Sequence, residues 1–215
     1  MRRIAIAVGL VLLLHSAVPA QQTGLTDGQI KAAEIELPEL TRLLGLKPGM
    51  TVADVGAGFG AWTVRLAGLV GPAGRVFATD IGEKQLAALR DYTAREGLAN
   101  VTVLEGAADT TNLPALCCDA ILIRDAYHHL TEPESIGKSL AGALKPGGRL
   151  AVIDFPPRPN SEVPSGVPGN RGGHGVPPEV VEREVGKVLT YVQTVRDWAP
   201  KSEPASLYLV LFRKP

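Results

Sequence analysis

Cysteine, aromatic side chains and net charge are all scarce in this chain of 215 residues. Its 22 basic and 22 acidic residues balance, and no stripe is dense in Lys and Arg, so no nucleic acid partner is expected. The two cysteines, Cys117 and Cys118, are neighbours, and neighbouring cysteines rarely bridge each other without strain. We therefore expect no disulfide framework and, with only two soft ligands, no metal site. Aromatic residues amount to 5%, while aliphatic residues dominate, which favours a sheet covered by helices.

The longest apolar run stands at the start of the chain. Arg2 and Arg3 precede the eleven apolar residues 4–14, and small residues at 18–20 follow, which is the order of a secretory signal. Eleven apolar residues are too few to span a bilayer comfortably, since about 20 are needed, and we expect no stable membrane span beyond this leader. An uncleaved anchor is the alternative. We predict a signal-like segment at 1–20, one domain at 21–215, and an exported, periplasmic protein.

Strand-like and helix-like segments alternate after the leader. The stretch 27–46 is helical in character, with Asp27 as a candidate cap and Pro38 as a candidate kink. Such alternation predicts a parallel sheet with helices on both faces. We expect strands at 51–56, 75–80, 101–105, 119–123 and 150–155, and helices at 60–70, 83–96 and 132–144.

The end of the chain departs from this alternation. A helix is expected near 178–188, followed by strands at 190–197 and 206–213 that a short connection joins, so these strands should pair as an antiparallel hairpin. Residues 156–178 form the one long irregular segment and contain seven prolines and five glycines. It leaves the carboxyl end of a strand, where ligands of open α/β sheets bind, so we interpret it as a lid loop.

Three alternate glycines follow the first expected strand, in Asp-Val-Gly-Ala-Gly-Phe-Gly at 54–60. In a strand–turn–helix unit, such a loop lets a ligand approach the backbone, and the helix start offers free N–H donors. Asp80 ends the second strand, 24 positions after Gly56, where a carboxylate can accept both hydroxyl groups of a ribose. Together these features predict a nucleoside site.

Two classes of cofactor share this layout. Gly56, Gly58 and Ala61 fit a dinucleotide pattern, whereas Gly56, Gly58 and Gly60 fit a site for S-adenosylmethionine. A short-chain reductase would usually carry Tyr-x-x-x-Lys, and no tyrosine here has a lysine four residues later. Dinucleotide folds also seldom end in an antiparallel hairpin. The nicotinamide interpretation is therefore the weaker one.

Across about residues 26–214 the chain resembles the class I S-adenosylmethionine-dependent methyltransferases. The resemblance implies a three-layer Rossmann-like α/β sandwich with a seven-stranded, mostly parallel sheet whose last strand is antiparallel. One departure is the turn before the fourth strand, commonly rich in Gly, Ser and Asp, which is Ala-Leu-Cys-Cys here. The stretches that carry the resemblance are DVGAGFG at 54–60, VFATDI at 76–81, EGAADTTNLP at 105–114, CDAILIRDAYHHL at 118–130 and LKPGGRLAVIDF at 144–155.

The resemblance also implies which residues hold S-adenosylmethionine. The loop that begins at Asp54 would surround the methionine portion and the ribose, and Asp80 would bind the ribose hydroxyl groups. Ile81 would pack on the adenine, and Asp109 would accept a hydrogen bond from its amino group. The cofactor-binding residues expected on this basis are Asp54, Gly56, Ala57, Gly58, Gly60, Asp80, Ile81, Ala108, Asp109 and Arg124.

The expected reaction is in-line transfer of a methyl group to a small-molecule acceptor. Such a displacement mainly requires alignment of the reactants and exclusion of water. If the acceptor is an alcohol, phenol or amine, one base helps, and a histidine suits that role because it changes charge near neutral pH. Asp125, His128 and His129 are the candidate catalytic residues. Packing of either histidine is the alternative, and His174 is expected at the surface of the loop.

The leader and the cofactor conflict, because S-adenosylmethionine is a cytoplasmic compound. An active exported enzyme is one interpretation. A cytoplasmic enzyme whose true start lies downstream is the second, and that start cannot be Met50 without loss of the first helical region. The third is an exported module of the same fold that binds a nucleoside or another small molecule without catalysis.

Overall fold

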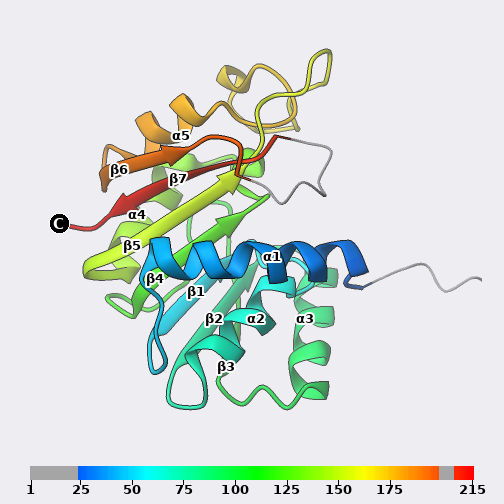
Figure 1. The fold of residues 1–215 in the computed structure, drawn as a ribbon. Coiled ribbons are helices and arrows are strands. Elements are labelled where there is room, and N and C mark those ends of the chain that lie inside the picture. Colours follow the sequence, from blue (N-terminus) through cyan, green and yellow to red (C-terminus); the bar gives the residue numbers. More distant parts are fainter. Residues whose placement is uncertain (1–23, 199–205) are drawn as a thin grey trace, which may run out of the picture.

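A seven-stranded sheet lies at the centre of the molecule, between two layers of helices (Figure 1). The computed structural model describes residues 24–198 and 206–215. The strand order is β3-β2-β1-β4-β5-β7-β6, and β7 is antiparallel to both β5 and β6. This confirms the expected Rossmann-like fold and its terminal hairpin. The strands are β1 (Thr51–Val55), β2 (Arg75–Asp80), β3 (Val101–Glu105), β4 (Cys118–Arg124), β5 (Leu144–Asp154), β6 (Thr190–Val195) and β7 (Tyr208–Arg213).

Helices cover both faces of this sheet. The first three pack on one face, with Leu40 and Leu66 in a shared core, and the next two pack on the other face around Leu140 and Val181. Two short 3₁₀ turns, η1 (Tyr127–His129) and η2 (Gly169–Arg171), complete the regular structure. The α-helices are α1 (Asp27–Leu44), α2 (Ala61–Val70), α3 (Glu83–Arg95), α4 (Pro133–Ala143) and α5 (Pro178–Val185).

Helix α1 differs from expectation at two points. Its N-cap is Thr26 rather than Asp27, because Thr26 and Gln29 form a reciprocal capping box that satisfies two backbone N–H groups. Pro38 lies inside the helix without dividing it. The fully buried face around Leu40, packed against α2, stabilises the helix across the missing hydrogen bond, since tertiary packing supplies most helical stability.

The parallel strands bring four residues to one edge of the sheet. Val55, Asp80, Arg124 and Asp154 are the last residues of β1, β2, β4 and β5. These strands are paired in parallel as β2-β1-β4-β5, so their carboxyl ends meet. Strands that are buried on both faces position these ends rigidly, and the crevice outside them is where open α/β sheets bind ligands.

At the opposite edge, a disulfide bond joins Cys117 to Cys118. The expectation that these cysteines would not bridge each other was wrong. The pair follows Leu116, whose φ of +53° marks a sharp turn into β4. A bond between neighbours closes no loop of chain, so it does not form a framework that restrains the unfolded state.

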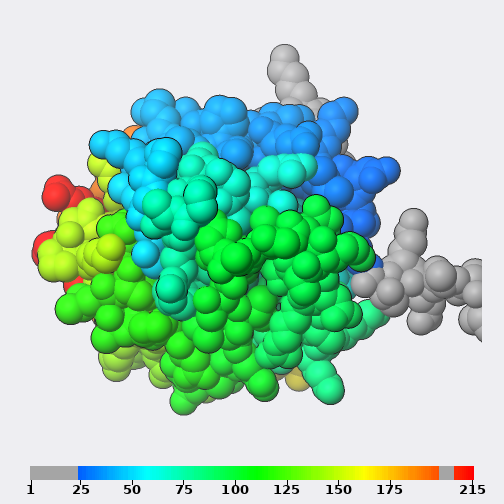
Figure 2. All heavy atoms as spheres, turned by 90° about the horizontal axis from the view of Figure 1, so that it is seen from below, coloured from blue at the N-terminus to red at the C-terminus, as the bar shows by residue number. Residues whose placement is uncertain are grey.

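A space-filling view from below shows the face next to β3 (Figure 2). The blue-to-green first two thirds of the chain form most of it, and the red C-terminal segment reaches only its margin. Within residues 24–198 and 206–215, no helix has both the length and the apolar character that a membrane crossing requires. The signal-like segment lies outside the described residues and stays a prediction.

Candidate active site

The glycine loop after β1 forms the floor of the candidate site. Gly56, Gly58 and Gly60 have φ values of +72°, +55° and +91°, a region that other residues rarely adopt. A Cβ atom on Gly56 would lie 2.5 Å from the Cβ atom of Ala126, so only glycine fits there. The backbone N–H groups of Gly56 and Ala57 both donate to the carbonyl oxygen of Thr79, which ties the loop to β2.

Asp80 holds the far side of this loop. Its carboxylate accepts hydrogen bonds from the backbone N–H of Gly58 at 2.8 Å, of Ile81 at 2.8 Å and of Gly82 at 3.0 Å. Ile81 beside it is 68% exposed, which is unusual for a large apolar side chain. A half-buried carboxylate next to an uncovered apolar side chain offers the two contacts that a ribose and a purine ring need.

Two cavities lie on either side of the loop. The larger has a volume of about 590 Å³ and runs from Asp80 and Ile81 to His129 and Ser165. The smaller, of about 110 Å³, lies between the loop and α1. Gly56, Gly58 and Asp125 line both, so the two cavities are neighbours across the loop.

Asp54 lies at the bottom of the smaller cavity. Its side chain is buried, and burial raises its pKa from 3.8 to about 6, because the charged form loses its hydration. The Thr63 hydroxyl donates to it at 2.6 Å and partly offsets this effect, whereas the nearby charge of Asp80 adds to it. A buried carboxyl group in a small cavity is suited to bind a cationic group of a ligand.

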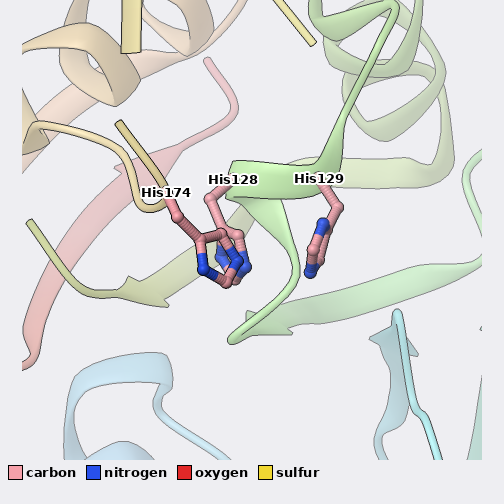
Figure 3. Close-up of side chains that lie close together, drawn as sticks. All are labelled: His128, His129 and His174. Atoms are coloured by element: carbon pink, nitrogen blue, oxygen red, sulfur yellow. The ribbon is translucent and has the colours of Figure 1, made fainter. Parts of the chain in front are cut away.

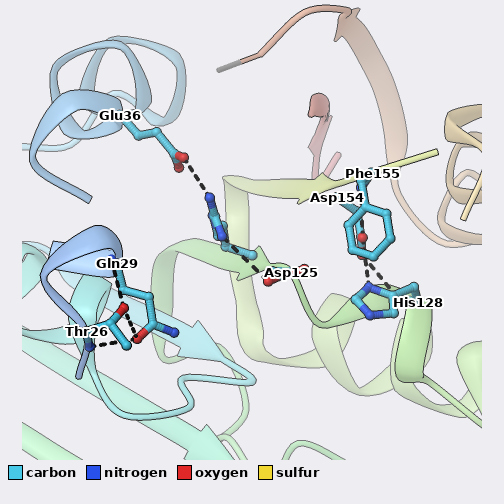
Figure 4. A network of polar contacts seen from close by, with 8 residues as sticks. Thr26, Gln29, Glu36, Asp125, His128, Asp154 and Phe155 are labelled. Atoms are coloured by element: carbon cyan, nitrogen blue, oxygen red, sulfur yellow. Dashed lines mark hydrogen bonds and ion pairs between the residues drawn. The ribbon is translucent and has the colours of Figure 1, made fainter. Parts of the chain in front are cut away.

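Arg124 lines this cavity and contacts α1. Its guanidinium donates to the carboxylate of Glu36 at 3.0 Å (Figure 4). The guanidinium also lies 4.3 Å from the ring centroid of Trp62. Oδ2 of Asp125 lies 3.7 Å from Nη1 of Arg124. The side chains of Arg124 and Glu36 are 6% and 1% exposed, so the ion pair is buried. The pair therefore fastens α1 over the cavity, a contact between residues 88 positions apart that the sequence did not reveal.

Most of the expected cofactor residues line the two cavities. Gly60 instead caps α2, and a Cβ atom there would lie 2.6 Å from Leu89. Asp109 is exposed and is not part of either wall, although its neighbours Ala108 and Thr110 line the larger cavity. The expected residues found in the walls are Asp54, Gly56, Ala57, Gly58, Asp80, Ile81, Ala108 and Arg124.

The candidate catalytic residues lie together beyond β4. Asp125 has a φ of +57°, an unfavourable conformation for a residue with a side chain, and it lines both cavities. His129 is exposed at one side and lines the larger cavity. Partial desolvation of its ring, together with the nearby imidazoles of His128 and His174, lowers its pKa below 6.5. His128 is buried and lines neither cavity.

His128 is fixed by Asp154 at the end of β5. Its Nδ1 lies 2.8 Å from Asp154 Oδ1, and its backbone N–H donates to Asp154 Oδ2 at 3.0 Å (Figure 4). The N–H of Phe155 also donates to this fully buried carboxylate, at 2.9 Å. His174 lies 4.9 Å from His128 between ring centroids, and 5.6 Å from His129 (Figure 3). His174 was expected at the loop surface, but it is half-buried in this cluster.

The Pro/Gly-rich segment packs over the site. Ser165 lines the larger cavity, and a Cβ atom on Gly166 would lie 3.1 Å from Thr131. Further along, fully buried Arg171 donates to Glu184 at 3.0 Å. Tyr127 donates to the same carboxylate, and its burial raises its pKa. Tyr127 therefore anchors the segment instead of lining the pocket.

Comparison with known proteins agrees with this geometry. Residues 52–148 match the family model described as a methyltransferase domain. The ubiquinone/menaquinone biosynthesis C-methyltransferase UbiE of Ectopseudomonas mendocina is 35% identical over 114 residues, which are 53% of this chain and 44% of that protein. UbiE of Marinomonas sp. is also 35% identical, over 57% of this chain and 49% of its own length. The chain thus spans about half the length of these curated relatives.

Among solved structures, a SAM-dependent methyltransferase from Aquifex aeolicus superposes with a TM-score of 0.68 and 26% identity, over 89% of this chain and all of that one. In its domain match, its fold and its cavity the chain is therefore similar to the S-adenosylmethionine-dependent methyltransferases, whose cofactor is S-adenosylmethionine. The residues present fit that cofactor, because a buried carboxyl group, an open glycine backbone and an acid beside an exposed apolar side chain follow one another along the walls.

Proposed function

We propose that this chain transfers the methyl group of S-adenosylmethionine to a small molecule that enters the larger cavity. The observation that carries the proposal is that the cavities on the two sides of the glycine loop are lined by chemically different groups. Asp54 offers a carboxyl group on one side, Asp80 and Ile81 offer a ribose and purine site on the other, and Asp125 borders both. A cofactor that spans the loop would direct its sulfonium methyl group toward Asp125 and His129.

The residues around that methyl group suit a displacement. S-adenosylmethionine supplies an activated methyl carbon, so the chain itself has to align the acceptor and exclude water. Ile123, Ala126 and Leu130 provide apolar surface next to the polar groups. His129 has a lowered pKa and is neutral at neutral pH, so it can accept a proton from an acceptor hydroxyl group. His128, with Nδ1 directed at Asp154, positions the turn that carries His129.

The acceptor proposed here is a small molecule with an acidic hydroxyl group. The curated relatives are named as C-methyltransferases of quinone biosynthesis, which supports transfer to a ring carbon that a hydroxyl group activates. The family match ends at residue 148, however, before the segment 156–177 that borders the acceptor side. The acceptor is therefore proposed only as a chemical class, a hydroxylated ring compound, and not as a particular quinone.

Titration calorimetry with S-adenosylmethionine and S-adenosylhomocysteine tests the cofactor site. One equivalent of either ligand should bind, and Asp80→Asn should weaken binding while Asp91→Asn, an exposed acid on α3, should not. Absence of heat with both ligands would overturn the proposal. Methyl transfer is then measured with a labelled methyl group against hydroxylated ring compounds, aliphatic alcohols and amines. Binding without transfer to any of them would favour the non-catalytic module of the same fold.

Export of the protein is also proposed, on the basis of the leader alone. The two arginines, the apolar run and the small residues at 18–20 support it. Cell fractionation with N-terminal sequencing of the mature protein tests it. A mature chain that begins near Gln21 in the periplasmic fraction is the expected result, and a cytoplasmic protein that retains or never had residues 1–20 would contradict it.

A further inference from the structure

Three imidazole groups meet where η1 and the Pro/Gly-rich segment come together. His128 and His129 lie on η1, and His174 comes from the segment before α5 (Figure 3). The ring centroids of His128 and His129 are 4.0 Å apart. One ligand nitrogen from each of the three residues lies within 4.8 Å of the other two. We propose that His128, His129 and His174 bind a divalent transition metal of the zinc type, with an open position toward the larger cavity.

The distances fit three nitrogen ligands after small side-chain movements. Zinc binds imidazole nitrogen at about 2.0–2.1 Å, so three nitrogens on a tetrahedral ion are about 3.4 Å apart. Neutral imidazole nitrogen prefers zinc and its transition-metal neighbours to magnesium or calcium, which take oxygen ligands. Ring torsions of exposed His129 and half-buried His174 can supply the remaining approach, while buried His128 stays in place.

Asp154 presents the first of these ligands. Its Oδ1 lies 2.8 Å from Nδ1 of His128, so Nδ1 carries the hydrogen and Nε2 retains a lone pair. In zinc sites the ring nitrogen that does not bind the metal usually donates a hydrogen bond to a carboxylate or carbonyl group, which fixes the tautomer and orientation of the histidine. The other contacts of Asp154, with the N–H groups of His128 and Phe155, hold this carboxylate rigidly. Asp154 is thus a positioning residue that also supplies negative charge near the ion.

The backbone of the Pro/Gly-rich segment holds the third ligand over the first two. The N–H of His174 donates to Ser161 Oγ at 2.8 Å, and its carbonyl oxygen accepts from the N–H of Arg158 at 2.9 Å. A Cβ atom on Gly173 would lie 2.9 Å from a carbonyl oxygen, and one on Gly175 would lie 2.7 Å from another. Glycine on both sides of His174 is therefore required by the close approach that brings the imidazole to η1.

The fourth position of such an ion would face the acceptor. His129 lines the larger cavity, whereas His128 and Asp154 lie behind it. This orientation rests on the proposed function, but metal binding itself does not. With the ion bound, His129 would be a ligand and no longer the base. The ion would lower the pKa of a hydroxyl group bound at the open position, and the released proton would pass to solvent.

The test is titration of the full chain, carrying no histidine tag and first treated with a chelator, with Zn²⁺ followed by calorimetry and with Co²⁺ followed by its absorption spectrum. One ion per chain and a tetrahedral Co²⁺ spectrum are expected. His129→Ala and His174→Ala should each weaken binding at least tenfold. The double variant Cys117→Ser/Cys118→Ser should bind as well as the unaltered chain, because these sulfur atoms are at the opposite edge of the sheet.

Neither His129→Ala nor His174→Ala removes a fully buried side chain, so a folded protein is expected, and its unchanged melting temperature without metal is the control. Absence of binding by the unaltered chain would overturn the inference, and so would an affinity in both histidine variants equal to that of the unaltered chain. Both outcomes are read without cofactor or acceptor. If the metal does not bind, the calorimetric test of the cofactor site is therefore unaffected.

Discussion

Asp80 accepts a hydrogen bond from the backbone N–H of Gly58 at 2.8 Å, so the acid at the end of β2 and the glycine loop after β1 are joined directly. The same carboxylate accepts two further backbone N–H groups, from Ile81 and Gly82. A cofactor that enters the larger cavity therefore meets an acid whose position is already fixed. Preorganisation of this kind reduces the ordering that binding requires.

Asp80→Ala should weaken binding of S-adenosylhomocysteine by about 1–3 kcal/mol, because charge-assisted hydrogen bonds to the ribose are lost. This corresponds to roughly a fivefold to 150-fold rise in Kd. Calorimetry provides the measurement, with Asp91→Ala on α3 as the control for loss of one surface acid. Unchanged affinity in Asp80→Ala would mean that the ribose is held elsewhere.

Substitution of Asp54 should have opposite effects on the stability of the protein and on its affinity for the cofactor. The folded protein keeps a proton on Asp54 up to about pH 6, whereas the unfolded chain releases it near pH 3.8. Stability therefore falls as the pH rises through this window. Asp54→Asn removes that loss, and the new amide oxygen can still accept from Thr63, so the variant should be more stable at pH 7 by about 2–3 kcal/mol.

The same substitution, Asp54→Asn, should weaken binding of the cofactor. The ionised Asp54 carboxylate would pair with the ammonium group of S-adenosylmethionine, so affinity for the unaltered protein should fall as the pH drops below about 6. Asp54→Asn should bind more weakly at pH 7 and show no such dependence. Urea unfolding and calorimetry at pH 5, 6, 7 and 8 measure both effects. Parallel changes in stability and affinity would contradict the assignment.

Gly56 and Gly58 differ in what surrounds them, and alanine substitutions should separate packing from binding. In Gly56→Ala the new Cβ atom meets Ala126 at 2.5 Å in a left-handed conformation, so we expect a loss of about 2–5 kcal/mol in unfolding free energy. In Gly58→Ala nothing lies within 4 Å, and only the conformational cost of about 1–2 kcal/mol remains.

Gly58 lines both cavities, so its alanine variant should nevertheless bind S-adenosylhomocysteine at least tenfold more weakly. Thermal unfolding and calorimetry on the two variants provide the comparison. If Gly58→Ala binds normally, the cofactor does not approach the backbone of this loop.

The ion pair of Glu36 with Arg124 should matter far more than an exposed pair on the same helix. Glu36→Gln leaves a buried guanidinium with less compensating charge, and the expected loss is about 3 kcal/mol. Glu39→Gln removes a pair whose side chains are 47% and 66% exposed, and it should change stability by less than about 0.5 kcal/mol. Chemical denaturation of both variants measures the difference, and equal losses would show that the buried pair does not fasten α1.

Much of the fold was predictable because its signals are local. Strands β2 and β3 begin and end at the expected residues, since each is an apolar run bounded by turn residues. The capping box at Thr26 was missed although Thr-x-x-Gln is visible in the sequence, because the neighbouring Asp27 is an equally plausible cap. The kink expected at Pro38 did not divide α1, because the packing that stabilises the helix across it involves residues distant in the sequence.

The candidate site was predictable only where one motif carries several residues. The glycine loop and Asp80 belong to such motifs, and the structure brings them together. Contacts between distant segments left no local signal. Glu36 reaches Arg124 from 88 positions away, and His174 reaches His128 from a segment whose composition indicates only a loop. The signal-like leader and the role of Asp109 stay predictions.

The two cavities are bordered by segments that lie far apart in the chain. Leu25 and Gln29 near the start of α1 border the smaller one, and Ser165 borders the larger one. Under the proposed function, changes in the segment 156–177 would therefore alter the choice of acceptor without changing the residues that line the cofactor side. A chimera that exchanges only this segment with that of another family member would transfer substrate preference as a module.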